Sequence, residues 1–282
     1  MRVLHLDAGR DMRGGQWQAL RLIEGLAAEG VESTLLACGG SPLFEAARRG
    51  GWRVESIGFL TTLVKARKHD LVHAHDARGH TFGTIVTDRP LVVSRRVAFP
   101  VRSQWKYARA ARFLAVSEFV KSVLSAGDVP AEKIAVVYDG VPLLEQSQGS
   151  RLIALRKNGV APELDLENSE HLESDLRDAG ILVYLTASEG LGSGALLAMS
   201  AGVPVIASRV GGLPEVVRHR ETGLLVKNTA ESIRAAIREL TNDRALARRF
   251  GEAGRQDVRQ KFTVQHMVRR TMEEYKQALS HG

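Results

Sequence analysis

The order of apolar and polar residues along the chain predicts strands and helices in regular alternation. Short apolar runs typical of buried strands lie at residues 2–6, 33–37, 52–57, 71–74, 91–93, 113–116 and 134–137. Segments with apolar residues at helical spacing separate them, at residues 16–29, 43–49, 63–68, 80–88, 104–111 and 119–126. Alternation of this length predicts an α/β fold, with a doubly wound parallel sheet and crossover helices on both faces.

The alternation stops between residues 139 and 149 and then resumes. Pro142, Gly149 and the polar residues between them are typical of a linker. Further strands are predicted at residues 152–155, 164–167, 181–185, 203–207 and 224–226, and helices from Ala230 onward. We therefore expect two domains, residues 1–143 and residues 144–282, the second ending in a helix at about 264–280.

The composition agrees with a globular α/β protein, and the distribution of apolar residues bears on where in the cell it is expected. The chain has 282 residues, 44% of them hydrophobic and 25% charged, as in ordinary globular proteins. Its first residues lack the apolar core of a signal peptide, and no apolar run is long enough to cross a bilayer. We expect a cytoplasmic protein, in which the single Cys38 forms no internal disulfide.

A strand followed by glycine turns and helix starts marks the segment from residue 188 to 217. Glu189 follows the strand at 181–185, and the chain then turns into a helix near residue 195. Glycines in such a turn let the backbone approach a ligand, and the helix that follows presents amide groups to an anion. A carboxylate among them suits hydrogen bonding to sugar hydroxyls. The turn residues that we expect to bind such a ligand are Gly190, Leu191, Gly192, Ser193 and Gly194.

This segment resembles the donor-binding core of the GT-B glycosyltransferases of family 4. In that family a glutamate and a second glutamate eight residues later precede a Pro-Val strand and a Gly-Gly turn, as Val203-Pro204-Val205 and Gly211-Gly212 do here. The resemblance extends more loosely to residues 14–15, 73–76, 116–118 and 138–141. It implies two Rossmann-like domains facing a cleft, with the last helix, at about 264–280, packing back across the first domain. It also implies transfer of a sugar from a nucleotide diphosphate donor to an acceptor hydroxyl.

The resemblance also implies roles for individual residues. Glu189 would hold the transferred sugar and His75 would lie near the reacting sugar, so these two are the expected catalytic residues. Gly14 and Gly15, in a turn before the first helix, would let that helix present its amino end to the donor diphosphate or to the acceptor. The basic pair Arg156 and Lys157 would bind the donor diphosphate. The implied chemistry retains the anomeric configuration and needs no metal or other cofactor. It would serve glycan, lipopolysaccharide or glycolipid synthesis in the cell envelope.

The chain departs from the family pattern in two places. Only about forty residues separate the linker from Glu189, so at least one βα unit of the second domain is expected to be missing. Leu197 stands where the second glutamate contacts the nucleotide ribose, and it cannot accept a hydrogen bond. The alternative is therefore a degenerate GT-B scaffold that binds a sugar nucleotide, a glycan or a protein partner without catalysis. An epimerase of the same architecture is a weaker alternative, because no catalytic pair supports it.

The first half of the chain is the more basic one. Residues 1–145 carry 20 lysines and arginines against 15 acidic residues, and the stretch from Arg95 to Arg112 contains no acid. We expect Arg102, Lys106 and Arg109 on one helical face, which with Arg95 and Arg96 could meet a phosphorylated or lipid-linked acceptor or the inner face of an anionic membrane. A merely solvated face is the alternative. No motif for nucleic-acid binding accompanies the charge.

Two histidines end the predicted strand at residues 71–74. His75 lies at the carboxyl end of a parallel strand, where ligands bind in open α/β sheets. We expect the rings of His73 and His75 on opposite faces of the sheet, and therefore no zinc pair. Ser117 is expected to cap the next helix, with Glu118 in its first turn.

Overall fold

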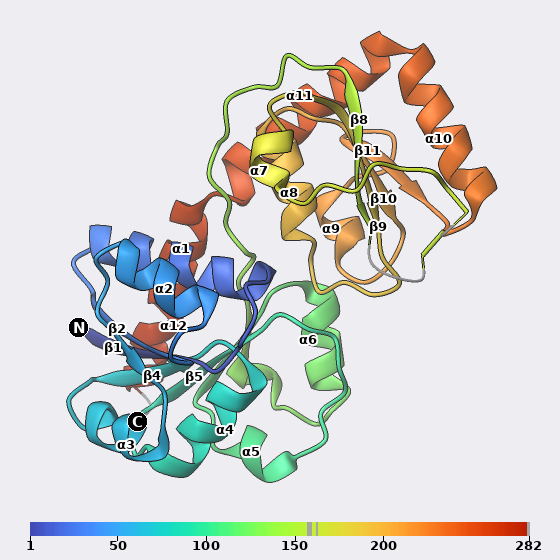
Figure 1. Ribbon diagram of the computed structural model, residues 1–282. Coiled ribbons are helices and arrows are strands. Elements are labelled where there is room, and N and C mark those ends of the chain that lie inside the picture. The colour runs from blue at the N-terminus through green and yellow to red at the C-terminus, as the bar shows by residue number, and fades with distance from the viewer. Residues whose placement is uncertain (157–159, 162, 281–282) are drawn as a thin grey trace. The chain divides into compact units, whose positions relative to one another are not determined.

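The computed structural model describes residues 1–156, 160–161 and 163–280 (Figure 1). The chain forms two compact units, one of residues 1–138 together with residues from 264 onward, and one of residues 139–263. The boundary thus lies at Asp139 rather than after residue 143, and the last helix groups with the first unit by its contacts. Both units are α/β, as the alternation predicts.

The first unit is built on a seven-stranded parallel sheet. Its strand order is β3-β2-β1-β4-β5-β6-β7, so the direction of winding reverses between β1 and β4. The strands are β1 (Arg2–Asp7), β2 (Glu32–Ala37), β3 (Val54–Ser56), β4 (Leu71–Ala74), β5 (Leu91–Arg95), β6 (Arg112–Ala115) and β7 (Ile134–Val136). The reversal defines a switch point, where the carboxyl ends of two neighbouring strands leave space for a ligand.

Helices connect these strands, and two of them begin at polar caps that lie two residues after a strand end. Asp76 accepts the Gly79 N–H at the start of α4, and Ser117 accepts the Val120 N–H at the start of α6. The cap predicted at Ser117 is confirmed. The helices of this unit are α1 (Gly14–Ala28), α2 (Pro42–Arg49), α3 (Phe59–Ala66), α4 (Ala77–Val86), α5 (Gln104–Ala108), α6 (Glu118–Ser125), a 3-10 turn at Ala131–Lys133 and α12 (Val264–Ser280).

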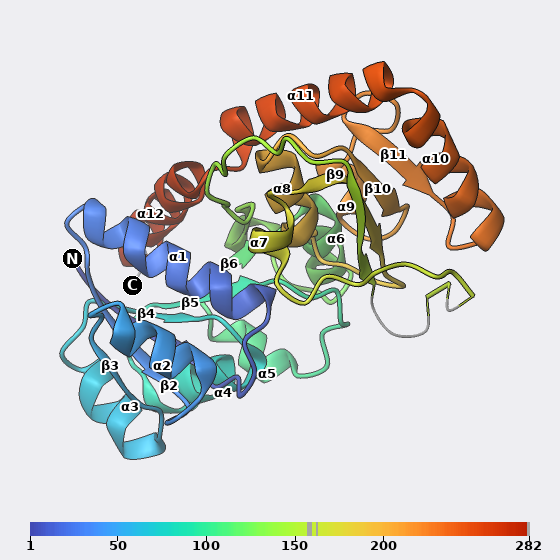
Figure 2. The same cartoon turned by 45° about the horizontal axis from the view of Figure 1, so that its top comes forward.

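The C-terminal helix α12 packs beside α1 on one face of this sheet, and α4 covers the other face (Figures 1 and 2). Gly25 permits the close approach of the two helices, because a Cβ there would lie 2.4 Å from Val268 Cγ2. Arg112 Nε donates to the buried Glu274 carboxylate at 2.8 Å and so joins β6 to α12. Apolar contact and one buried ion pair together hold α12 in this unit.

The second unit has a smaller parallel sheet with no reversal in its described strands. Its order is β11-β10-β9-β8, which is the order of the sequence read from one edge. The strands are β8 (Arg151–Arg156), β9 (Ala179–Leu185), β10 (Val205–Ser208) and β11 (Gly223–Val226). The helices are α7 (Leu172–Asp175), α8 (Ser193–Ser200), α9 (Leu213–Val216), α10 (Ala230–Asn242) and α11 (Arg244–Lys261). The expected abbreviated domain is thus present.

Three local predictions are wrong. Gly14 and Gly15 do not form a turn, because they are already the first residues of α1, after the N-cap residue Arg13. Residues 164–167 form no strand. Asn168 makes only an isolated bridge to Ala154, at the edge of β8. The helix at 104–111 ends at Ala108, where the chain turns toward β6.

Candidate functional site

The switch point of the first unit collects polar side chains from three neighbouring strands. Asp7 ends β1, His75 follows the end of β4, and Arg96 follows the end of β5. The register pairs His5 of β1 with His73 of β4, so two further histidines lie side by side in the sheet. In a doubly wound sheet these strand ends are where ligands bind.

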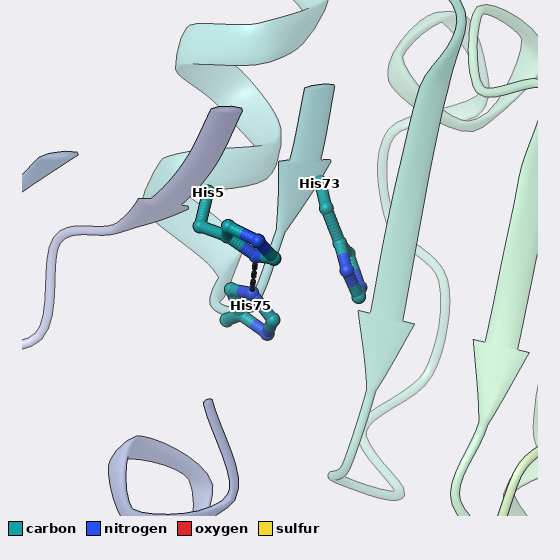
Figure 3. A group of neighbouring side chains, drawn as sticks. All are labelled: His5, His73 and His75. Atoms are coloured by element: carbon teal, nitrogen blue, oxygen red, sulfur yellow. Dashed lines mark hydrogen bonds between the residues drawn. The ribbon is translucent and has the colours of Figure 1, made fainter. Parts of the chain in front are cut away.

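The three histidines form one buried cluster (Figure 3). Their ring centroids lie 4.1 Å apart for His73 and His75, 5.2 Å for His5 and His75, and 5.7 Å for His5 and His73. The side chains are almost inaccessible to solvent. The expectation of opposite faces is wrong, because side chains alternate along a strand with a period of two and residues two apart therefore share a face.

Every ring nitrogen of this cluster has a polar neighbour. His5 Nδ1 lies 2.9 Å from His75 Nε2, and His5 Nε2 lies 3.2 Å from Ser33 Oγ. His73 Nδ1 lies 2.5 Å from the Tyr275 hydroxyl, and its Nε2 lies 2.8 Å from Ser94 Oγ. Arg96 Nη1 lies 3.4 Å from His75 Nδ1. The rings are close enough to be considered as metal ligands, but their lone pairs and N–H groups are already used in hydrogen bonds.

Burial keeps the cluster neutral. Burial, with a smaller contribution from the charge of the nearby His69, lowers the pKa of His5 to about 3. Burial also holds the pKa of His73 and of His75 well below the usual value, and the neighbouring histidines and Arg96 add to this effect. The imidazoles therefore act as neutral hydrogen-bonding groups near pH 7.

The amino end of α1 lies next to this cluster. Gln16 Nε2 donates to the buried Asp7 carboxylate at 3.1 Å and so fixes the start of the helix to the end of β1. Burial, followed by the charge of Asp76, raises the pKa of Asp7. A Cβ on Gly15 would lie 3.8 Å from the Arg96 side chain. The first turn of α1 and the Arg96 guanidinium thus bring positive charge to one place.

The second unit holds Glu189 in the loop that follows β9. The Tyr184 hydroxyl donates to Glu189 Oε2 at 2.6 Å, and the Gly190 N–H donates to Oε1 at 3.1 Å. Burial raises the pKa of Tyr184 well above its usual value, and the Glu189 charge adds to this. The phenol therefore stays a donor that holds the half-buried carboxylate in position.

Glycines bring the loops after β9 and β10 into direct contact. Gly211 has a φ of +57°, and a Cβ there would lie 2.0 Å from the Glu189 carbonyl oxygen. The N–H of Gly212 donates to that same oxygen at 3.1 Å. The turn predicted at residues 211–212 therefore supports the backbone of Glu189.

Helix α8 starts directly after this loop. Gly192 is its N-cap residue with a φ of +110°, a backbone conformation suited to glycine, and a Cβ on Gly194 would lie 2.6 Å from Leu155. The first-turn amides of Ser193 and Gly194 have no partner within the helix and are the groups an anion would meet. Leu191 and Leu197 are buried, so Leu197 is a core residue.

The structure describes only one member of the predicted basic pair, Arg156, which is the last residue of β8. Arg156 Nη1 donates to the carbonyl oxygens of Ala161 and Leu164, at 3.1 and 2.8 Å, and so holds the chain that follows β8. Lys157 lies outside the described residues. A contact of either cation with a diphosphate stays a prediction.

The basic stretch of the first unit does not form one helical face. Arg102 precedes α5 and Arg109 follows it, because the helix has only five residues. Lys106 Nζ donates to the Ala77 carbonyl at 2.8 Å, and Arg95 donates to the Phe99 carbonyl. Phe99 and Trp105 are exposed, at 69% and 56%. Basic and aromatic groups thus occur together on this segment, without helical order.

Models of two protein families match the chain, one on each unit. The model described as Glycosyltransferase Family 4 matches residues 12–144, and the model described as Glycosyl transferases group 1 matches residues 165–257. The chain belongs to glycosyltransferase family 4. The matched regions contain His73, His75 and the Glu189 loop, whereas His5 precedes the first of them.

Curated relatives are similar in sequence to parts of this family-4 chain. Alpha-maltose-1-phosphate synthase of Mycolicibacterium smegmatis is 32% identical over 164 residues, which are 56% of this chain and 40% of that protein. N-acetyl-alpha-D-glucosaminyl L-malate synthase of Bacillus anthracis is 36% identical over 107 residues, 37% of this chain and 28% of that protein. The matched segments thus span less than half of either relative.

Solved structures share the fold of this family-4 chain. Anabaena HepE, in complex with UDP and glucose, superposes with a TM-score of 0.86 at 15% identity, covering 98% of this chain and 99% of that one. Sucrose-phosphate synthase of Thermosynechococcus elongatus gives 0.79 at 16% identity, with all of both chains covered. These similarities show the GT-B fold. Among the described residues, no helix combines the length and apolarity that a membrane span requires.

Several residues of these two sites are not among those predicted from the sequence. The sequence contains an indication of Tyr184, because a buried tyrosine in an apolar strand needs a hydrogen-bond partner for its hydroxyl. It contains a weaker indication of His5, which is a polar residue inside an apolar run. It contains no indication of Tyr275, which lies 202 residues from its partner His73.

Proposed function

We propose that this chain transfers a glycosyl group from a nucleoside diphosphate sugar to an acceptor hydroxyl. The observation that carries the proposal is the fixed carboxylate of Glu189 beside the amino end of α8. A carboxylate accepts hydrogen bonds from sugar hydroxyls, and the helix start favours the adjoining phosphate. HepE was solved in complex with UDP and with UDP-glucose, which makes a uridine nucleotide the first donor to test.

The expected chemistry uses charge stabilisation by the chain itself. Negative charge develops on the departing diphosphate, and the amides of Ser193 and Gly194 with the α8 dipole would stabilise it. Glu189 would hold the transferred sugar, and His75 would orient a hydroxyl of the sugar or of the acceptor. We propose that the reaction retains the anomeric configuration and needs no metal, so excess EDTA should leave the transfer rate unchanged.

A panel of nucleotides tests this function. UDP, GDP, ADP and their sugars are compared for their effect on the melting temperature, and the stabilising donor is then assayed for transfer and slow hydrolysis. Glu189→Gln should lower turnover by about 100-fold or more, a typical loss for a group that acts in the transition state. The matched control is Glu231→Gln, an exposed glutamate of the same unit. Binding without turnover dependent on Glu189 would support the alternative, a degenerate scaffold.

The acceptor side is proposed to be lipid-linked, at the inner face of the membrane. The support is the joint exposure of Phe99 and Trp105 among Arg95, Arg102 and Arg109. Sedimentation with vesicles containing anionic lipid should be lost when both aromatic residues are changed to serine. Trp17→Ser, which removes an exposed aromatic residue outside this segment, should leave it unchanged. Binding that persists in the double variant would contradict the membrane proposal.

A further inference from the structure

Three hydrogen bonds connect Arg96 to Ser33 through His75 and His5, and the donor and acceptor of each can be assigned. A guanidinium can only donate, so Nδ1 of His75 must be the acceptor of the Arg96 contact at 3.4 Å. A neutral imidazole has one N–H, which His75 then carries on Nε2 and donates to His5 Nδ1 at 2.9 Å. His5 is left with its N–H on Nε2, which faces Ser33 Oγ at 3.2 Å.

We infer that Arg96 locks His75 and His5 into one tautomer each, so that Nδ1 of His75 is held as a hydrogen-bond acceptor for a substrate hydroxyl. The substrate hydroxyl would take the place of the Arg96 N–H, whose contact of 3.4 Å is the longest of the three hydrogen bonds from Arg96 to Ser33. Arg96 and His5 are then positioning residues. This role rests on the proposed function of His75, but the tautomers themselves do not.

Protonation would break this arrangement. A second proton on His75 would sit on Nδ1 and face the Arg96 guanidinium, which offers only N–H groups. A second proton on His5 would face the N–H of His75. The chain of hydrogen bonds therefore works only with neutral rings, as the burial of both residues requires.

The third histidine belongs to a separate pair of hydrogen bonds. His73 faces Tyr275 and Ser94, and neither of these residues contacts His5 or His75 in the hydrogen bonds described above. Tyr275 is thus a control within the same cluster, since its hydroxyl can be removed without touching the Arg96 to Ser33 chain.

A metal ion is the competing occupant. An ion held by the three rings would take the lone pair of His75 Nε2 and move the proton to Nδ1, where it would face Arg96. The cation would also meet the positive guanidinium. A metal centre and the Arg96-locked tautomer therefore exclude each other, and one measurement separates them.

Nitrogen NMR of the full chain labelled in its histidine rings tests the tautomers directly. For wild type we expect His75 and His5 both protonated at Nε2 and unprotonated at Nδ1, unchanged on addition of EDTA. Arg96→Met should give His75 a mixture of tautomers, whereas Arg96→Lys, which keeps a donor, and Tyr275→Phe should not. A proton on Nδ1 of His75 in wild type, or stoichiometric zinc binding lost in His73→Ala, would overturn the inference.

Kinetics then test the positioning role separately. His5→Leu removes the acceptor for His75, and we expect kcat to fall about tenfold while KM for the donor stays within about threefold. His5→Asn keeps an acceptor and should recover most of kcat. If His5→Leu does not fold, Arg96→Met gives the same comparison with Arg96→Lys. Correct tautomers with unchanged kcat in these variants would refute the positioning role, whereas a wild type without transfer activity would refute only the proposed function.

Discussion

The candidate sites of the two units are formed by different parts of their sheets. In the first unit the strand order reverses between β1 and β4, and the site residues come from the strands themselves and their ends. In the second unit the described strands follow one another in sequence order, and the site lies in the loops after β9 and β10. One site depends on side-chain hydrogen bonds between buried histidines, and the other on close backbone contact between glycine turns.

This difference shows what an abbreviated domain has to retain. A sheet without a reversal has no switch point to open a crevice, so the ligand-binding edge must be shaped by its loops. Gly211 and Gly212 shape this edge, because they lie against the backbone of Glu189 and Gly190 and support it. The comparison predicts that the second unit is sensitive to backbone changes, and the first to changes in buried polar groups.

The largest effect is expected for Gly211→Ala. The new Cβ would lie 2.0 Å from a carbonyl oxygen at a φ of +57°, so the second unit should lose about 4 kcal/mol of stability together with donor binding. Hydrogen exchange would locate the loss. All three tryptophans lie in the first unit, whose fluorescence-detected unfolding should be unchanged. Gly30→Ala is the control, since its φ is +72° with open space around it, and it should cost about 1 kcal/mol.

The next effect concerns Arg112→Met in the first unit. Removing the arginine leaves the Glu274 carboxylate unpaired and buried, which should cost about 3 kcal/mol in urea unfolding followed by tryptophan fluorescence. Arg270→Met removes an exposed partner of Glu273 and should cost less than about 0.5 kcal/mol. Equal costs would mean that the pairing of Arg112 with Glu274 adds nothing to the stability of the first unit.

A pH effect should distinguish the buried histidines. The folded pKa of His5 is about 3, whereas the unfolded value is about 6.5, so only the unfolded chain takes up this proton between those values. Stability should therefore fall as the pH falls, and His5→Asn should remove about 2 kcal/mol of the loss between pH 7 and pH 5. Tryptophan-detected unfolding at both pH values measures this. His171→Asn, an exposed histidine of the second unit, should not change the difference.

The smallest effect is expected for Tyr184→Phe. The variant removes the donor to Glu189 Oε2, so the carboxylate is less well placed and transfer should slow about tenfold, with about 1 kcal/mol lost from the second unit. Tyr107→Phe, a buried tyrosine of the first unit that stacks on Phe113, should leave the rate unchanged. A rate equal to wild type for Tyr184→Phe would show that the loop glycines alone position Glu189.

Much of the fold was predictable because its signals are local. The strand at residues 71–74 and the cap at Ser117 depend on hydrophobic period and on the residue at one helix start. The errors are also local. The glycine pair Gly14 and Gly15 predicts a turn, whereas α1 begins at Gly14, because Gln16 anchors the helix start to Asp7.

The sequence by itself determined the two α/β units, the smaller size of the second, and the placement of Glu189 between glycine turns. Each of these depends on residues close together in the chain, through periodicity and turn chemistry. Only the tertiary structure decided that His5 pairs with His73, that Arg96 reaches His75, and that Tyr275 of α12 closes the cluster. The physical reason is that strand order and the packing of a distant helix bring these residues together, and neither is a local property of the chain.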